Sequence, residues 1–292
     1  MTVQDQTHSK QEFAAPLAGT PMAREQAVKF LGLIFFAVLA WILIAVVIWL
    51  ARRNLWAVSH ITGYILFVVV LGLVFLKARK RLLVLPLGPV RDWLLLHFVL
   101  GALSLPLYFQ HTGTLWPQGR YEQFIALFFY TASLSAIVGI IFQRVYPRRL
   151  IDLGSQVIYE RIPTELANLR EEAEALVLQA VRETSSDTVG RYYAESFQWF
   201  FQKPRFVLSH LLGTGRSLGW IQMRVKVLDR FLNQTEREFM HKLEAIAIRK
   251  NGLDAHYAMQ GALKLWLFVH VPSAILLVLL ACWHLIVVNI YS

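Results

Sequence analysis

The sequence has one cysteine and little charge, and both shortages exclude classes of protein. Because Cys282 is the single cysteine, the chain cannot form an internal disulfide, a CxxCH haem attachment or a cysteine-based zinc or iron–sulfur site. Any bound metal would have to be held by histidine or carboxylate. Charged residues make up only 16% of the 292 residues, against roughly 25% in an ordinary soluble domain. Together with a hydrophobic content of 56%, this excludes a disordered or simply soluble protein.

The apolar residues are gathered into five stretches without Asp, Glu, Lys or Arg. These stretches are 30–51, 54–76, 93–119, 123–143 and 265–292. Each supplies the ~20 residues that a helix needs to cross ~30 Å of hydrocarbon. We therefore predict an all-α integral membrane bundle of five transmembrane helices with a cytoplasmic helical insertion. The expected segments are a flexible tail at 1–28, transmembrane helices 1–4 at 29–143, the cytoplasmic domain at 144–262 and transmembrane helix 5 at 263–292.

The basic residues predict the orientation of the chain. The net charge of +10 is concentrated beside apolar runs, which is typical of cytoplasmic loops and does not require nucleic acid as a partner. The loop after the second span holds five basic residues: Lys77, Arg79, Lys80, Arg81 and Arg91. The next turn holds only Arg120, whereas Arg52 and Arg53 oppose the pattern mildly. We expect a multi-pass protein of the bacterial inner membrane with a cytoplasmic N-terminus and a periplasmic C-terminus.

The long polar insertion has a helical pattern. Apolar residues recur at helical spacing over 164–183 and again over 221–248. Between these stretches lies an aromatic cluster: Tyr192, Tyr193, Phe197, Trp199, Phe200, Phe201 and Phe206. Three roles are open for the cluster, which are packing on the helices, lying at the bilayer surface and contacting another subunit.

Four histidines share one spacing within the apolar spans. His97 and His111 are 14 residues apart on the third span, and His270 and His284 are 14 apart on the fifth. Fourteen residues fall about 40° short of four helical turns, so both members of a pair share a face, about 21 Å apart along the axis. The two spans run in the same direction. If they are neighbours, His97 faces His270 and His111 faces His284, which gives two clamps of two imidazoles.

Two facing imidazoles on membrane helices suit a haem, whose iron accepts one axial nitrogen from each side. A zinc or copper site would need a third or fourth donor, and the spans contain no Asp or Glu at either level. The segments HFVLGALSLPLYFQH and HVPSAILLVLLACWH resemble the haem-ligating helices of membrane dihaem cytochromes b and related bacterial haem subunits. The resemblance implies two b-type haems, with His97 and His270 ligating one and His111 and His284 the other. The chain departs from respiratory cytochrome b in its long insertion and in lacking a recognisable Pro-Glu quinol motif.

Three further residues are candidates for cofactor binding. His60 lies near the outer end of the second span, at the depth of His111 and His284, and four roles are open for it. These roles are to replace His111 or His284 as a ligand, to donate a hydrogen bond to a haem propionate, to face a quinone, or to lie at the membrane interface with a backbone partner. Arg91 and Arg120, at opposite ends of the third span, are candidate partners of haem propionates, although basic residues at span ends are expected in any case.

Iron with both axial positions filled has no open site for substrate, so the resemblance implies electron transfer and no bond chemistry. The expected path runs across the membrane, between a quinone pool or cytoplasmic donor and a periplasmic acceptor such as a c-type cytochrome. The insertion would dock other subunits of an oxidoreductase complex. Two alternatives remain open, which are a proton or metal transporter that uses the intramembrane histidines and a membrane scaffold protein.

Overall fold

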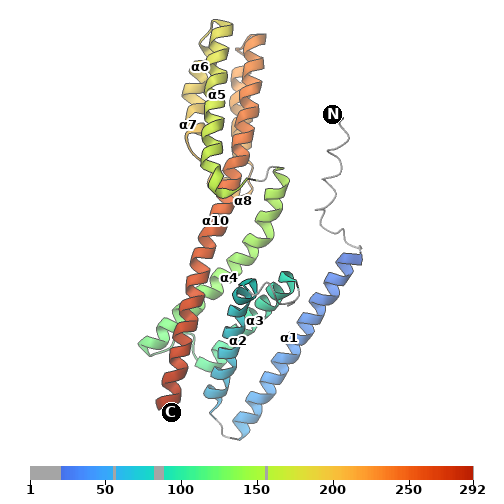
Figure 1. Cartoon of the computed structure of the whole chain (residues 1–292), viewed down its shortest axis with the longest axis vertical. Coiled ribbons are helices and arrows are strands. Elements are labelled where there is room, and N and C mark those ends of the chain that lie inside the picture. Colours follow the sequence, from blue (N-terminus) through green and yellow to red (C-terminus); the bar gives the residue numbers. More distant parts are fainter. Residues whose placement is uncertain (1–20, 55–56, 82–88, 155–156, 292) are drawn as a thin grey trace. The chain divides into compact units, whose positions relative to one another are not determined.

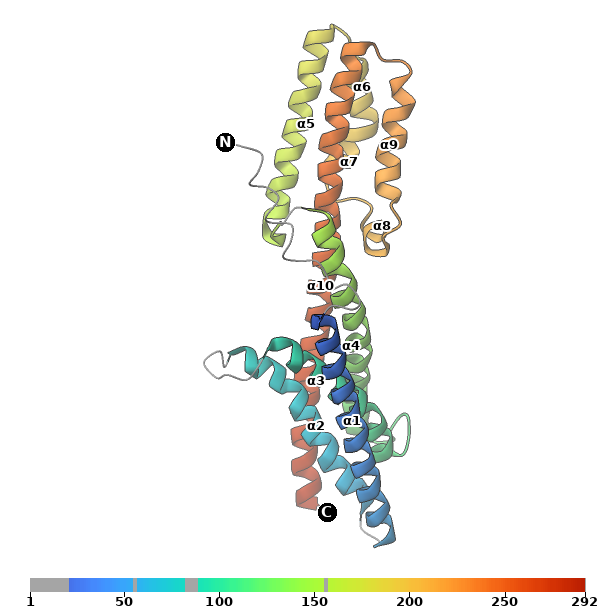
Figure 2. The ribbon, with the colours of Figure 1, turned by 90° about the vertical axis from the view of Figure 1, so that its right-hand side faces the viewer.

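The computed structural model describes residues 21–54, 57–81, 89–154 and 157–291. Among these, the side chains of 21–27, 29–30, 33–34, 76–81 and 91 are not described. Most of the predicted tail at 1–28 and the side chain of Arg91 therefore lie outside the described residues. Every regular element in the described ranges is a helix, which confirms the predicted all-α class. The α-helices, labelled in Figure 1 except for α9, which is labelled in Figure 2, are α1 (Pro21–Arg53), α2 (Val58–Arg81), α3 (Val90–Thr112), α4 (Arg120–Asp152), α5 (Ile162–Thr184), α6 (Thr188–Tyr192), α7 (Gln198–Gln202), α8 (Val207–Leu212), α9 (Arg216–Asp229) and α10 (Gln234–Tyr291).

In the part of the chain that the structure describes, five helices are long and apolar enough to cross a membrane, as predicted. They are α1, α2, α3, α4 and α10. Large apolar side chains on these helices face outward, for example Phe36, which is 65% exposed, and Phe268, which is 77% exposed. Such exposure is unfavourable in water and is expected in lipid. The chain therefore has the character of a multi-pass membrane protein.

The third span is shorter than predicted. The uncharged stretch continues to residue 119, but α3 ends at Thr112 because Gly113 adopts a left-handed conformation with φ 66°. The amide of Gly113 donates a hydrogen bond to the carbonyl of Phe109 and closes the helix.

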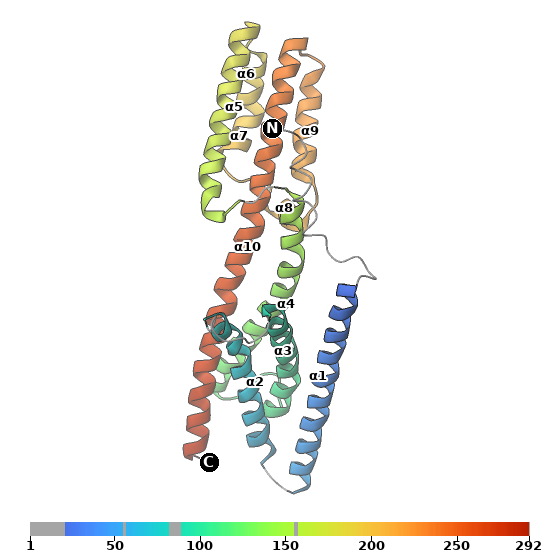
Figure 3. The same ribbon diagram turned by 45° about the vertical axis from the view of Figure 1, so that its right-hand side comes forward.

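The chain divides into two compact units, which are described separately. Unit 1 comprises Met1–Ser133 and Ser273–Ser292, and unit 2 comprises Leu134–Pro272. In unit 1, α2 and α3 lie side by side in all three views (Figures 1 to 3). Val70 of α2 and Tyr108 of α3 are buried in a cluster with residues of α4 and α10, where the ring of Tyr108 stacks on Phe129 at 4.2 Å.

Unit 2 has an aromatic core. The rings of Phe197, Phe200 and Phe201 are almost completely buried among α5, α9 and α10, and Phe200 packs on Trp220 with ring centroids 5.3 Å apart. Figure 2 shows α5, α9 and α10 running alongside one another in this unit. Of the three roles left open for the aromatic cluster, packing therefore describes these three phenylalanines. Trp199 remains 43% exposed.

The predicted amphipathic stretch at 221–248 is two helices. The chain leaves α9 after Asp229 and begins α10 at Gln234. The side chain of Asn233 accepts a hydrogen bond from the amide of Glu236, and the Glu236 carboxylate accepts one from the amide of Asn233, at 2.8 and 2.9 Å. This reciprocal capping box starts α10 and interrupts the apolar pattern that the sequence carries through the break.

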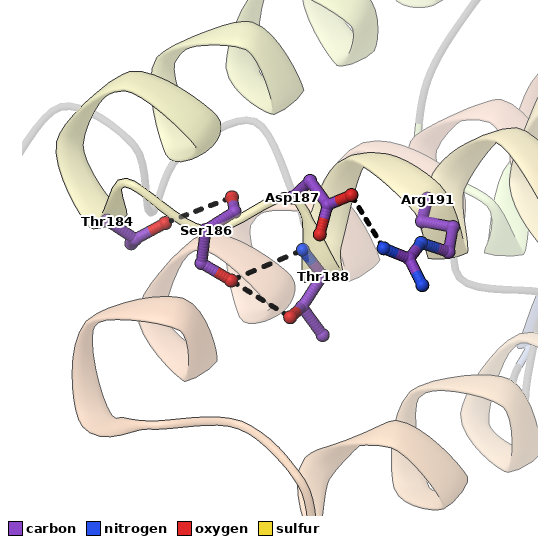
Figure 4. A network of polar contacts seen from close by, with 5 residues as sticks. All are labelled: Thr184, Ser186, Asp187, Thr188 and Arg191. Carbon is purple, nitrogen blue, oxygen red and sulfur yellow. Dashed lines mark hydrogen bonds and ion pairs between the residues drawn. The ribbon is translucent and has the colours of Figure 1, made fainter.

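The turn between α5 and α6 is held by short polar side chains (Figure 4). The hydroxyl of Ser186 accepts a hydrogen bond from the amide of Thr188 at 3.3 Å and shares a second one with the Thr188 hydroxyl at 2.9 Å. Asp187 forms an exposed ion pair with Arg191 at 2.7 Å. These contacts reverse the chain and allow α6 to pack back on α5.

Candidate functional site

Two backbone carbonyls of α2 hold the two histidines of α3. Nδ1 of His97 lies 3.0 Å from the carbonyl oxygen of Leu73, and Nδ1 of His111 lies 2.9 Å from that of Ser59. A carbonyl oxygen only accepts, so each Nδ1 carries the proton and donates it. In the neutral imidazole the lone pair is then on Nε2, which is the arrangement of a metal-ligating histidine oriented by its surroundings. Both histidines of α3 therefore have the tautomer that a ligand requires.

A glycine makes room for the ring of His111. A Cβ atom on Gly63 would lie 2.8 Å from Cε1 of His111, closer than real Cβ atoms come to a neighbour, and 3.1 Å from Nδ1, which is also tight. Gly63 is one helical turn beyond Ser59, so its missing side chain opens the path to the Ser59 carbonyl. The ring thus fits into a cradle of α2 that any larger residue would fill.

His284 of α10 completes a pair with His111 within unit 1. The ring centroids of the two imidazoles are 6.3 Å apart, with an angle of 83° between the ring planes. On its other side, His284 stacks on Tyr121 of α4 at 6.1 Å and 19°. The Tyr121 hydroxyl donates to the carbonyl of Leu280, one turn before His284. The outer predicted pair is therefore brought together and held by residues of α2 and α4.

His270 lies in unit 2 and has its own supporting residues. Its Nδ1 is 2.8 Å from the hydroxyl of Ser135 on α4, and its ring stacks on Trp266 at 5.5 Å and 19°. The indole Nε1 of Trp266 donates to the carbonyl of Ser135 at 2.7 Å, and a side chain on Gly139 would collide with that indole. The orientation of His270 is thus fixed by α4. Its predicted partner His97 belongs to unit 1.

Two of the three remaining candidates, His60 and Arg120, occupy the same end of unit 1 as the His111 and His284 pair. His60 is exposed in the first turn of α2, directly after Ser59, whose carbonyl holds His111. Arg120 is the exposed first residue of α4 and precedes Tyr121, which stacks on His284. Arg91 is the second residue of α3 and lies at the opposite end of that helix, which carries His97.

A second concentration of ionisable groups lies in the polar part of unit 2. The ammonium of Lys250 and the carboxylate of Asp254 are fully buried and 2.6 Å apart. Lys250 also donates to the carbonyl of Lys203 at 3.0 Å, and Asp254 accepts from the amide of Arg205 at 3.2 Å. Burial raises the pKa of Asp254 to about 6 and lowers the pKa of Lys250 to about 8. Both shifts arise because the charged forms lose hydration, which the ion pair compensates only in part.

Within the described residues, no three His, Cys, Asp or Glu side chains converge as a polydentate metal site would need. What converges in unit 1 is a pair of imidazoles, and the donor set, the tautomer of His111 and the cradle at Gly63 fit a metal that His111 and His284 would hold between them. Comparison of the chain with protein-family models, curated proteins and solved structures finds no match.

Sequence reasoning missed the residues that support the histidines. Ser59 and Leu73 act through backbone carbonyls, which leave no trace in residue identity. Tyr121 and Trp266 are aromatic residues near the ends of spans, where such residues are expected anyway. One signal was present, since Ser59 and Leu73 are separated by the same 14 residues as His97 and His111, as an antiparallel pair of helices requires.

Proposed function

We propose that the protein is a dihaem b-type membrane cytochrome that carries electrons across the bacterial inner membrane. His111 and His284 would hold one haem, and His97 and His270 the other. The observation that carries the proposal is the spacing of the outer pair. Two imidazoles that ligate one ion from opposite sides, with metal–nitrogen bonds of about 2.0 Å, have centroids roughly 6.4 Å apart. The rings of His111 and His284 are 6.3 Å apart.

The chain's own residues would orient the ligands and exclude water. Hydrogen bonds from Nδ1 to a carbonyl increase the basicity of Nε2 and prevent the ring from turning. Tyr121 covers the face of His284, and the surrounding helices are apolar. A haem bound in this way supplies reversible one-electron chemistry, and a coordinated iron with two histidines has no open position for substrate.

The proposed path connects a quinone pool or cytoplasmic donor with a periplasmic acceptor such as a c-type cytochrome. In this proposal the N-terminus is cytoplasmic, the C-terminus is periplasmic and residues 144–262 form a cytoplasmic docking domain for other redox subunits. His60 and Arg120 lie at the same end of unit 1 as the outer pair, which supports a role for both with a haem propionate, or for His60 with a quinone.

The test is a haem count on purified protein. Dithionite-reduced minus oxidised spectra, with a pyridine haemochrome assay, should give two b haems per chain, and His111→Leu or His284→Leu should each remove one. His60→Leu is the matched control, because it removes an exposed histidine at the same end of unit 1 that is not one of the four proposed ligands, and it should retain both haems. Absence of haem after expression with adequate haem supply, or two haems in His111→Leu, would refute the proposal.

A further inference from the structure

The short helix α8 in unit 2 presents apolar side chains that the described residues leave exposed. Leu208 is 68% exposed and Leu212, one turn later, is 62% exposed, whereas Leu211 between them packs inward beside Tyr146 of α4 and Met259 of α10. The helix thus has one face on the protein and one apolar face directed away from it.

The position of α8 is fixed by its neighbours. The guanidinium of Arg149, near the end of α4, donates to the carbonyl of Leu211 at 2.9 Å. A Cβ atom on Gly213 would lie 2.8 Å from Arg149 Cζ, so only glycine allows this approach, and Gly213 has φ 72°. At the other end, Phe206 has φ 54° and packs on Trp220 at 5.8 Å. Both ends of α8 are therefore anchored, and Figure 2 shows the helix beside the end of α4.

This anchoring places α8 at the level of lipid headgroups. The uncharged part of α4 ends before Arg144, and Arg149 lies five residues further, or about 8 Å along the helix axis. Each headgroup layer extends roughly 5–8 Å beyond the hydrocarbon. Amphipathic helices at this level insert their apolar face about 5–10 Å into the boundary between headgroups and acyl chains. At this axial distance, the exposed Leu208 and Leu212 of α8 are within reach of that boundary.

The charges nearby favour an anionic lipid. Leu208, Leu212 and Thr214 line a surface cavity of about 350 Å³, and the exposed Arg216 forms part of its wall. The adjacent end of α4 adds three basic residues, Arg144, Arg148 and Arg149, against one acid, Asp152. Basic residues beside an apolar insertion are the combination that binds anionic headgroups at a membrane surface.

We infer that α8 and Arg216 form a membrane-surface site that binds an anionic phospholipid, with Leu208 and Leu212 inserted among the acyl chains and the phosphate held by Arg216. The site anchors the polar part of unit 2 to the bilayer. It does not depend on the haem assignment.

The test uses the full chain in vesicles, with Cys282→Ser and a single cysteine at Leu208→Cys carrying an environment-sensitive fluorophore. Lipids with a nitroxide on the headgroup should quench this label strongly. The matched control is Leu178→Cys, since Leu178 on α5 is also apolar and 59% exposed. The ion pair between Glu172 of α5 and Arg249 of α10 fixes the alignment of the two helices, and Leu178 lies about 30 Å along them from the apolar part of α10. A label at Leu178→Cys should therefore not be quenched.

Anionic vesicles should give more quenching at Leu208→Cys than neutral ones, and Arg216→Glu should lower the ratio of quenched to unquenched label about fivefold or more. Equal quenching at the two positions, or no dependence on anionic lipid, would overturn the inference. Shielding of Leu208 only at high protein-to-lipid ratio would also overturn it, because the surface would then be covered by a second copy of the chain.

Discussion

Replacing Gly63 with alanine tests the cradle that holds His111. The new Cβ would lie 2.8 Å from Cε1 of the imidazole, whereas carbon atoms in contact are about 3.5–4.0 Å apart, so the ring has to retreat by roughly 0.7–1.2 Å. This movement lengthens the 2.9 Å bond from His111 to the Ser59 carbonyl toward the limit of a hydrogen bond. Overpacking of this kind costs about 1–3 kcal/mol in the free energy of unfolding.

We expect Gly63→Ala to lower the thermal unfolding temperature and to reduce the haem content from two toward about one per chain, since a displaced ligand binds its metal 10–100-fold more weakly. The measurements are a thermal melt and the haemochrome count on the same preparation. Gly101→Ala is the control. Both substitutions gain about 1 kcal/mol from the higher helix propensity of alanine. The new Cβ at position 101 would contact only Cδ2 of Leu73, at an ordinary distance of 4.0 Å. If Gly63→Ala and Gly101→Ala have the same melting temperature and the same haem content, the cradle has no role. A lowered melting temperature of Gly63→Ala with full haem content would refute only the assignment of His111 as a ligand.

Three further outcomes follow from the structure. Lys250→Met should lower the free energy of unfolding by about 3–5 kcal/mol because it leaves Asp254 buried and unpaired, and Lys250→Met with Asp254→Leu should restore most of it in denaturant titrations. Burial and the charge of Lys250 lower the pKa of His210 to about 4, from 6.5 in the unfolded chain. The contribution of neutral His210 to the free energy of unfolding is therefore complete above pH 6.5 and is lost as the pH falls through 4. Melts at several pH values should show the wild type losing about 1–2 kcal/mol of unfolding free energy relative to His210→Leu over that range, a figure reduced to allow for the partial exposure of the ring. A difference between the two proteins that does not change with pH would contradict this. Ser135→Ala removes a bond to Nδ1 of His270 and should weaken haem retention about tenfold in a competition assay with apomyoglobin; unchanged retention would show that Ser135 does not orient a ligand.

The fold was largely predictable because membrane spans are a matter of composition. Long uncharged runs identify the five membrane helices without knowledge of their packing. Boundaries were less predictable. The end of α3 depends on the backbone conformation of Gly113, and the break before α10 depends on the cap at Asn233, and neither changes the apolar pattern.

The candidate site was predictable only for side chains that would act directly. Spacing alone selects His111 and His284, and the structure brings their rings together in unit 1. The contacts that set their orientation come from a carbonyl on α2 and a ring on α4, and these depend on which helices are neighbours. A periodic pattern in one helix carries no information about its neighbour.

The backbone of α2 sets the distance between the two points that hold the histidines of α3, although α2 supplies no side chain to either contact. Since Ser59 and Leu73 contribute main-chain oxygens, most residues at these positions would hold the imidazoles equally well. Inserting one residue between them would rotate one carbonyl by about 100° relative to the other and release one of the two rings. Related sequences should therefore vary freely at positions 59 and 73. They should keep the number of residues between these positions and the glycine at position 63.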